Sequence, residues 1–332
     1  MARRTPGRRR RAPAPSRRDW TRGTPLDTTR RRTSFSGLVA ELVDEQAQQA
    51  ASDEDALPDD EEAAPIVADP SMPRLVLADL ASGRMTGNAL HKILERAEFD
   101  VSNAEALAPL VGDELAHHGI DKQYVPAVTQ ALVDVLDTPL HPVGFDLRAI
   151  PRASRLPELA FVFPVAGGHE TQGKAFSVEA LRAAFAAHGA PMHARWKETL
   201  GRLRFESVRG FLSGSIDLAF RGPDGRYYVI DWKSNRLGHA HVAAEYSPDR
   251  LVRAMDAHHY HLQYHLYVLA FDRFLRTRLG GRYDYERDFG GVLYLFLRGM
   301  SPAHPPGTGV FYDRPSLALV QALSAAFGEG LR

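Results

Sequence analysis

The sequence predicts an α/β chain, because runs with the two-residue period of strands alternate with runs that have the period of helices. Residues 210–238 hold two alternating runs on either side of a Gly-Pro-Asp-Gly turn at 222–225, which is typical of a β-hairpin. Residues 290–299 form a continuous apolar run bounded by glycines, as expected of a buried central strand. Between these segments, residues 249–279 have the spacing of one long helix.

Shorter periodic segments fill much of the remaining chain. They are helices over residues 87–98, 113–137, 178–188 and 315–331, and a largely buried strand over 156–165. In the first of these helices, Leu90, Ile93, Leu94 and Ala97 form one apolar stripe. The stretch that follows the strand, up to about residue 201, is polar enough for us to expect it outside the core.

The composition is that of a globular protein, with 332 residues, 44% hydrophobic and 9% aromatic. The absence of cysteine excludes disulfides, a thiol nucleophile, cysteine-based zinc sites and cysteine-ligated iron–sulfur clusters. No apolar run reaches the length of a membrane span, and no apolar leader follows the first residues. We therefore predict a cytoplasmic protein without membrane contact.

The formal net charge of zero averages two segments of opposite charge. Residues 1–32 are rich in Arg and Pro and are predicted to be a disordered basic tail, either adding phosphate contacts or acting as a passive tail. Residues 33–74 are predicted to be a linker that contains the acidic run Asp53–Glu62, either solvated or folded back on the tail. Residues 75–332 are predicted to form the globular domain.

The predicted hairpin carries three charged side chains where a strand is usually apolar. The two-residue period puts Asp231 and Lys233 on one face of their strand, and Asp217 reaches the same place if the hairpin pairs in the simplest register. An isolated Asp-X-Lys is usually a solvated surface pair, but the additional Asp217 favours a site. A divalent metal such as Mg²⁺ would compensate the carboxylates, and the lysine would then activate water or stabilise charge on a phosphate.

The segment GSIDLAFRGPDGRYYVIDWKSNRLG, which ends at Gly238, resembles the active-site hairpin of RecB-type nuclease domains in the PD-(D/E)XK superfamily. In this resemblance Asp217 is the first acid, and Asp231 and Lys233 are the ends of the D-X-K motif. Ile216 stands where the superfamily usually has proline. The resemblance implies a restriction-endonuclease-like fold, in which a mixed central sheet flanked by helices carries the site on the hairpin.

Two residues before the hairpin fit the same family. A lone helical histidine is more often a packed or surface residue, but the pattern Gly87-x-x-x-His91-x-x-x-Glu95 resembles the family motif in which this histidine binds metal. Glu95 is either part of that motif or a partner on the helix surface. Glu158 is either an exposed acid at a strand edge or a site residue, and the resemblance favours a metal ligand.

Gln263 and Tyr267 match a Q-x-x-x-Y element that follows the D-X-K motif in this family. A tyrosine stripe on a helix is usually core or interface, whereas the resemblance implies that these two residues support the lysine or the nucleic acid. Four histidines crowd the same predicted helix. They are His258, His259, His261 and His265. Because consecutive helical positions point in different directions, we interpret them as surface or DNA-facing residues rather than a zinc site.

The resemblance implies Mg²⁺-dependent hydrolysis of DNA phosphodiesters in double-strand-break repair and recombination, as the nuclease part of a RecBCD-type exodeoxyribonuclease V. His91, Glu158, Asp217 and Asp231 would hold the metal, and Lys233 would activate the water. The implied partners are DNA, RecC- and RecD-like subunits and a helicase motor, since this sequence has no phosphate-binding loop of its own. The alternatives are a freestanding structure-specific endonuclease of the same superfamily and a non-catalytic DNA-binding or assembly module.

Overall fold

The structure is a computed structural model of the chain. It describes residues 31–34, 66, 69, 72–100, 104–165, 178–200 and 210–327. The predicted basic tail and acidic segment therefore lie outside the described residues, apart from Arg31 and Arg32. These two residues belong to a short strand, β1 (Arg31–Ser34), that runs parallel to the start of the hairpin.

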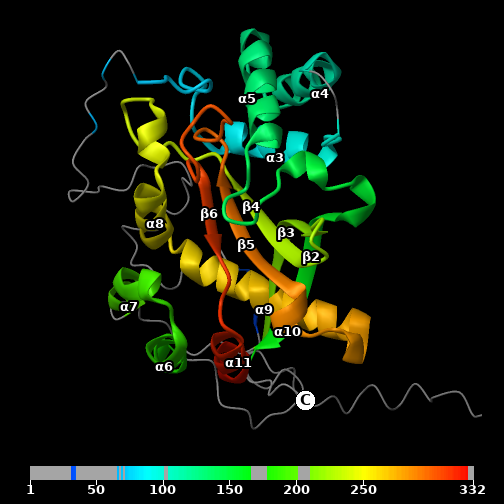
Figure 1. Ribbon diagram of the computed structural model, residues 1–332, viewed down its shortest axis with the longest axis vertical. Helices are drawn as coiled ribbons and strands as arrows, with labels where there is room; N and C mark the ends of the chain where they lie inside the picture. Colours follow the sequence, from blue (N-terminus) through cyan, green and yellow to red (C-terminus); the bar gives the residue numbers. More distant parts are fainter. Residues whose placement is uncertain are drawn as a thin grey trace, which may run out of the picture.

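A six-stranded mixed sheet forms the centre of the molecule (Figure 1). Its other strands are β2 (Arg155–Val165), β3 (Gly210–Arg221), β4 (Tyr227–Lys233), β5 (Phe289–Phe296) and β6 (Val310–Asp313). The order is β1-β3-β4-β5-β6, and β2 pairs with β3. Strands β3 and β4 form the predicted antiparallel hairpin, while β4 and β5 run parallel. The predicted α/β fold with a mixed sheet is confirmed.

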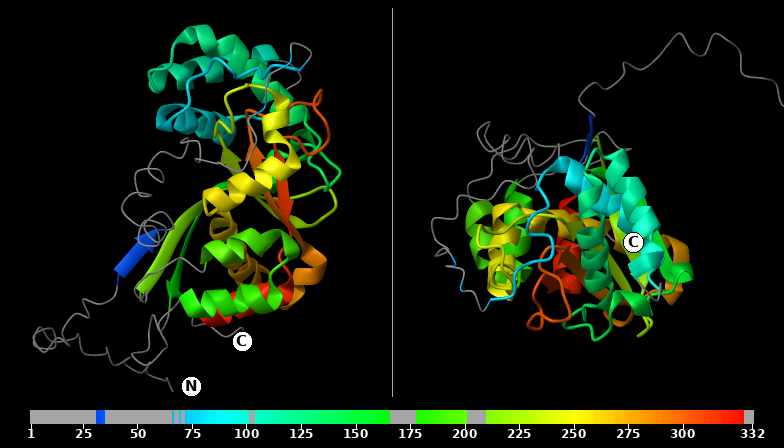
Figure 2. Two further views of the ribbon diagram at one scale, coloured as in Figure 1. Left: turned by 90° about the vertical axis from the view of Figure 1, so that its left-hand side faces the viewer. Right: turned by 90° about the horizontal axis from the view of Figure 1, so that it is seen from above.

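Helices pack on both faces of the sheet. They are α3 (Arg84–Arg96), α4 (Ala104–His117), α5 (Val125–Asp137), α6 (Val178–His188), α7 (Ala194–Leu200), α8 (Pro248–Ala257), α9 (Tyr260–Leu279), α10 (Tyr285–Asp288) and α11 (Leu317–Ala326). Figure 2 shows α3, α4 and α5 gathered at one end of the molecule and α6, α7 and α11 at the other. In the described part of the chain, no helix combines the length and hydropathy needed to cross a membrane.

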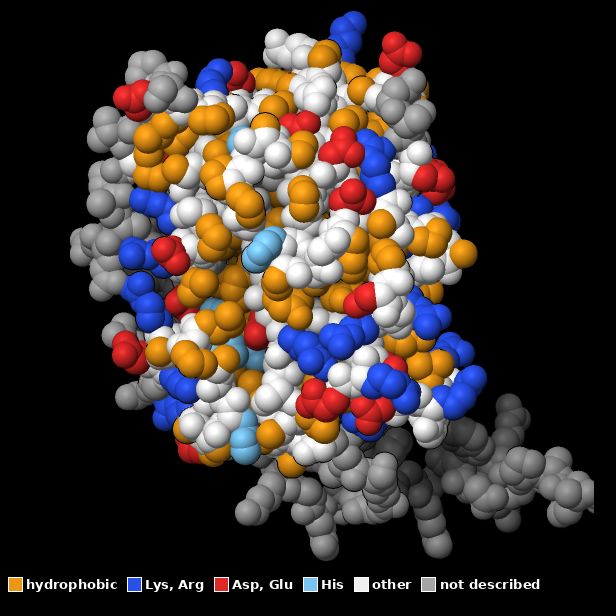
Figure 3. Space-filling model, in the orientation of Figure 1, with side chains coloured by type: hydrophobic (Ala, Val, Ile, Leu, Met, Phe, Trp, Pro, Cys, Tyr) orange, Lys and Arg blue, Asp and Glu red, His pale blue; other side chains and the backbone are white. Residues whose placement is uncertain are grey.

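Alternation along the central strands explains the two cores. In β5, Val292 and Tyr294 pack with α6 to α9 and α11, whereas Leu293 and Leu295 pack with α3, α4 and α5. Each strand residue therefore faces one helical layer or the other. Figure 3 shows that acidic, basic and apolar side chains are interspersed on one face of the surface.

Two predicted helices are each divided in the structure. The segment 249–279 forms α8 and α9, because His259 takes a left-handed backbone conformation (φ 55°) that ends the first helix. The segment 113–137 belongs to α4 and α5, which are joined by a short turn. Hydrophobic periodicity continues across both breaks and so did not reveal them.

Two predictions about burial were wrong. Strand β2 is not largely buried, since 46% of Leu156 and 56% of Val162 is exposed. Among the described strands it pairs only with β3, and this leaves its second edge unpaired. Conversely, the region of α6 and α7 was expected outside the core, but its residues Leu181, Phe185 and Trp196 are fully buried against α9 and its neighbours.

Candidate active site

The hairpin register brings the two aspartates of the predicted site to neighbouring positions. The last pair in the β3–β4 ladder is Leu218 with Ile230, so Asp217 and Asp231 lie one step beyond it. The backbone N–H of Trp232 donates a hydrogen bond of 2.8 Å to Asp217 Oδ2. The predicted register is therefore confirmed, and the hydrogen bond fixes the Asp217 carboxylate against the strand that carries D-X-K.

Asp217 is in an electrostatically unfavourable position for a carboxylate. Burial raises its pKa to about 7, and the nearby charge of Asp231 acts in the same direction. His91, the Trp232 N–H and Lys233 oppose this shift but do not cancel it. Two acids held this close in a desolvated place call for additional positive charge.

Helix α3 brings His91 to the hairpin. His91 Nε2 lies 2.9 Å from the Trp232 carbonyl oxygen, and Nδ1 lies 3.5 Å from Asp217 Oδ2. The apolar stripe predicted on this helix is buried and orients it. Gly87 allows the close approach, because a Cβ at this position would lie 3.1 Å from Ser234 Oγ.

Lys233 is the centre of the second half of the site. Its Nζ lies 2.7 Å from Asp231 Oδ2, and both side chains are almost fully buried. Lys233 Nζ also donates to Gln263 Oε1 at 3.3 Å, and Gln263 Nε2 donates to Tyr267 Oη at 3.0 Å. The structure thus brings four predicted residues into one buried network from β4 and α9.

Glu158 and Glu95 lie beside this network. Glu158 falls opposite Asp217 in the β2–β3 ladder, but it is exposed, has a φ of 49° and accepts a hydrogen bond of 2.8 Å from Ser215 Oγ. Its exposure matches the alternative of an acid at a strand edge. Glu95 forms an ion pair with Lys92 on α3 and lines a small hollow together with Asp217.

Comparison with known proteins identifies relatives of the chain. The RecBCD enzyme subunit RecB of Mycobacterium tuberculosis (strain ATCC 25618 / H37Rv) is 38% identical over 331 residues, covering 92% of this chain and 29% of that protein. RecB of Haemophilus influenzae is 36% identical over 254 residues (76% and 19%), and RecB of Escherichia coli K12 is 34% identical over 280 residues (81% and 21%). The chain is a homologue of RecB.

The chain spans between 19% and 29% of the length of these RecB relatives. No protein-family model matches it. The relatedness covers most of the described domain, including the region of the hairpin and α9, and it agrees with the resemblance found in the motifs.

The donors gathered in this RecB homologue suit a hard divalent cation, which prefers oxygen ligands. Asp217 and Asp231 supply carboxylates, and the Trp232 carbonyl oxygen faces His91 beside them. The raised pKa of Asp217 reflects buried negative charge that a cation would offset. His91, Asp217, Asp231 and the Trp232 carbonyl are the candidate ligands that the fold gathers here.

Sequence reasoning missed the contribution of Arg298, which follows β5. This buried arginine donates from Nε to the Ser234 carbonyl (2.7 Å) and from Nη1 to the Leu77 and Leu80 carbonyls (2.8 and 3.0 Å). A further bond of 3.1 Å joins Nη2 to Ala81 O. Arg298 thus fastens the segment before α3 to the exit of β4. In the sequence Arg298 stands out as a charge at the end of an apolar run and as part of the resemblance, but neither signal predicts these hydrogen bonds.

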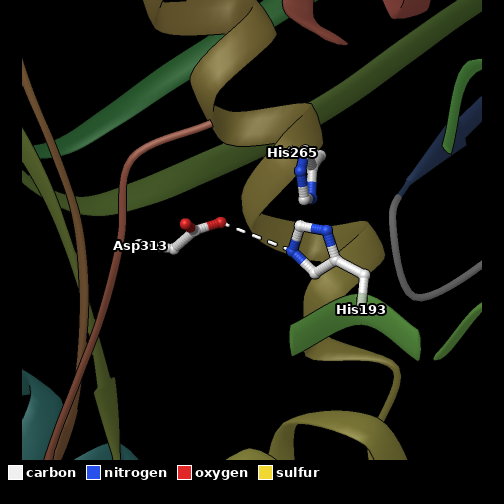
Figure 4. Close-up of side chains that lie close together, drawn as sticks. All are labelled: His193, His265 and Asp313. Atoms are coloured by element: carbon white, nitrogen blue, oxygen red, sulfur yellow. Dashed lines mark ion pairs between the residues drawn. The ribbon is translucent and has the colours of Figure 1, made fainter. Parts of the chain in front are cut away.

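The structure contains a second buried polar cluster, around α9. His193, His265 and Asp313 have possible metal-ligand atoms within 4.8 Å of one another (Figure 4). His261 and His265 are 0% and 2% exposed, so the prediction that they are surface or DNA-facing residues was wrong. They point into the core because α9 is covered on all sides over its first turns.

The hydrogen bonds explain the cluster without a metal ion. His193 Nδ1 accepts from Ala190 N–H (3.1 Å), so the ring proton is on Nε2, which donates to Tyr264 Oη (2.8 Å). Tyr264 Oη in turn donates to Asp313 Oδ2 at 2.7 Å. A metal-binding His193 would need a free lone pair on Nε2. In Figure 4 His265 lies against the His193 ring, and the ring centroids are 5.2 Å apart at 71°. The cluster is a hydrogen-bonded core network.

Proposed function

We propose that this RecB homologue is a Mg²⁺-dependent nuclease that hydrolyses DNA phosphodiester bonds, and that it acts in double-strand-break repair and recombination as the nuclease part of a RecBCD-type exodeoxyribonuclease V. The proposal rests on one observation above all. The D-X-K strand places Asp231 and Lys233 in a buried pair at 2.7 Å while its backbone holds Asp217 beside His91.

In this proposal His91, Asp217, Asp231 and the Trp232 carbonyl hold the ion, and Glu158 joins them only if its side chain leaves Ser215. When bound, Mg²⁺ supplies Lewis acidity beside the scissile phosphate. The N–H of Trp232 keeps the Asp217 carboxylate oriented toward the site.

Lys233 is the residue that acts on the reacting groups. The ion pair with Asp231 favours its charged form, which donates hydrogen bonds and stabilises negative charge as it develops on the phosphate. The same ammonium orients the attacking water. Gln263 fixes the direction of the side chain through its Oε1, and Tyr267 holds the Gln263 amide from the other end.

The partners follow from the relatives, which are named as subunits of the RecBCD enzyme. We propose that the chain works on DNA together with RecC- and RecD-like subunits and a helicase motor. The proposed compartment is the cytoplasm, where the DNA substrate is found in bacteria.

The experiment is degradation of linear duplex DNA by the purified chain with Mg²⁺, with an EDTA control. Asp231→Asn is compared with Asp113→Asn, a matched change of an exposed aspartate on α4. We expect Asp231→Asn and EDTA to abolish cleavage and Asp113→Asn to leave it unchanged. Cleavage that survives both treatments would refute the metal site. A folded chain that cleaves no DNA, alone or with RecC- and RecD-like subunits, would refute the nuclease.

A second arm compares blunt linear DNA with covalently closed circular DNA. An exonuclease needs an end, so we expect degradation of the linear substrate and survival of the circle. Cleavage of circles carrying a flap or a junction, at a rate equal to that of the linear substrate, would favour the alternative of a freestanding structure-specific endonuclease.

A further inference from the structure

The ammonium of Lys233 lies close to two tyrosine rings that belong to different elements. Lys233 Nζ is 3.9 Å from the ring centroid of Tyr260, the first residue of α9, and 5.2 Å from that of Tyr294 on β5. The two ring centroids are 5.5 Å apart. All three residues are at most 5% exposed. The charged end of the lysine is therefore buried against two neighbouring aromatic rings.

A buried ammonium has three N–H donors and needs more than one acid to compensate for lost water. Asp231 Oδ2 and Gln263 Oε1 contact the ammonium directly. The face of an aromatic ring carries negative potential and attracts a cation within about 6 Å of its centroid, most strongly where water is excluded. Both tyrosines satisfy this geometry for Lys233.

The two tyrosines are themselves held in different ways. Tyr260 Oη donates a long hydrogen bond of 3.3 Å to Asn235 Oδ1, and its ring is buried beside the lysine. Tyr294 Oη donates to Gln263 Oε1 at 2.8 Å, the same atom that accepts from Lys233. Tyr294 therefore also fixes the orientation of the Gln263 amide, so that its oxygen faces the ammonium.

We propose that Tyr260 and Tyr294 are positioning residues for the nuclease reaction and hold Lys233 against Asp231 through their rings, with Tyr294 acting additionally through its hydroxyl. This inference rests on the proposed function of the same site. In this proposal the side chain of Lys233 is positioned by residues of α9 and β5 as well as by its own strand, β4.

The kinetic test uses Tyr260→Phe, Tyr260→Leu and Tyr294→Phe in the complete chain, or in the complex with its partner subunits if the chain needs them. Cleavage of linear DNA is measured at saturating Mg²⁺. Tyr260→Phe keeps the ring, so we expect kcat within about twofold of the wild type. Tyr260→Leu removes the ring, and we expect kcat to fall about tenfold while KM for DNA is unchanged. Tyr294→Phe should lower kcat by about threefold through Gln263.

The matched control is Tyr285→Leu. Tyr285 is also a buried tyrosine, but it stacks on Phe289, at the end of β5 far from Lys233. We expect this change to lower Tm and leave the kcat of the folded enzyme unchanged. If Tyr260→Leu is unfolded at the assay temperature, Tyr260→Met replaces it, since methionine fills more of the vacated space. Equal kcat values for Tyr260→Phe and the variant without a ring would overturn the proposal.

A double-mutant cycle on unfolding separates this inference from the proposed function, because it needs no catalytic activity. The cycle combines Tyr260→Leu with Lys233→Met. It compares the free energies of unfolding, measured with denaturant, of the wild type, the two single variants and the double variant. We expect the losses of unfolding free energy to be clearly non-additive. In a chain that already carries Lys233→Met, the Tyr260→Leu change has no cation–π contact left to remove. Additive losses of unfolding free energy would refute the contact between Lys233 and the Tyr260 ring, even in a chain that cleaves DNA. Non-additive losses in a chain that cleaves no DNA would support the contact between Lys233 and the Tyr260 ring and would reject the nuclease function.

Discussion

Helix α9 takes part in two buried polar clusters, which differ in how their charges are satisfied. Gln263 and Tyr267 face the Lys233–Asp231 pair, whereas Tyr264 and His265 face His193 and Asp313. In the histidine cluster a backbone N–H fixes the tautomer of His193, and one tyrosine joins it to the carboxylate. In the lysine cluster two carboxylates stand near each other, and the burial of Asp217 raises its pKa to about 7. A second carboxylate beside the first, and not burial alone, distinguishes the candidate site from the core network.

Removing one group from each cluster tests whether the two clusters differ in function. We expect Lys233→Met to lower the cleavage rate by about 100-fold or more, since a charge-stabilising group at a reacting centre typically contributes that much. His193→Gln should leave the rate of the folded protein within about twofold. Both are measured as initial rates on linear DNA, well below each variant's Tm. Equal losses of rate would show that the two clusters work as one.

Arg298 connects the segment before α3 to the end of β4, beside the lysine cluster. Arg298→Met leaves several buried carbonyls without a donor, and we expect the free energy of unfolding to fall by about 3 kcal/mol or more. Denaturant unfolding measures the loss. Arg287→Met, a change of an exposed arginine on α10, is the control and should have little effect. Unchanged stability in Arg298→Met would contradict the role of Arg298 as a clamp.

The histidine cluster should be visible in the pH dependence of stability. Burial is the main cause that lowers the pKa of His265 to about 3, and the neighbouring His193 acts in the same direction, while His261 and Asp313 also lie near the ring. The unfolded chain binds a proton near pH 6.5 that native His265 does not take up, so stability is lost as pH falls through that range. This one group should contribute about 2 kcal/mol of loss between pH 7 and pH 5. His265→Phe keeps a ring in place and should flatten that slope, whereas an unchanged slope would contradict the prediction.

Tyr264→Phe gives the smallest expected effect. It removes the hydroxyl that joins His193 to Asp313 and should cost about 1–2 kcal/mol of unfolding free energy, with no change in cleavage rate. Thermal unfolding and the DNA assay check the two parts separately. A fall in cleavage rate similar to that of Tyr294→Phe would connect the histidine cluster to the reaction.

Sequence reasoning located the hairpin and its charged residues because these depend on local chemistry. A Pro-Asp-Gly turn and a period of two were enough to place Asp217 beside the D-X-K strand. The helical stripe likewise predicted the buried face of α3, whereas the placing of His91 at the site came from the resemblance. The prediction that Gln263 and Tyr267 lie near Lys233 came from resemblance, and the structure places them there.

The tertiary structure alone decided which distant residues complete each cluster. Parallel pairing of β4 with β5 sets Tyr294 opposite Asp231, and the left-handed His259 sets the start of α9 at Tyr260. Neither placement is marked in the sequence by a period or a motif. The first depends on long-range strand pairing, and the second depends on a single backbone angle. For the same reason the buried histidines resembled surface residues in the sequence. Local periodicity specifies the elements, and the packing of those elements decides which polar groups lose their water.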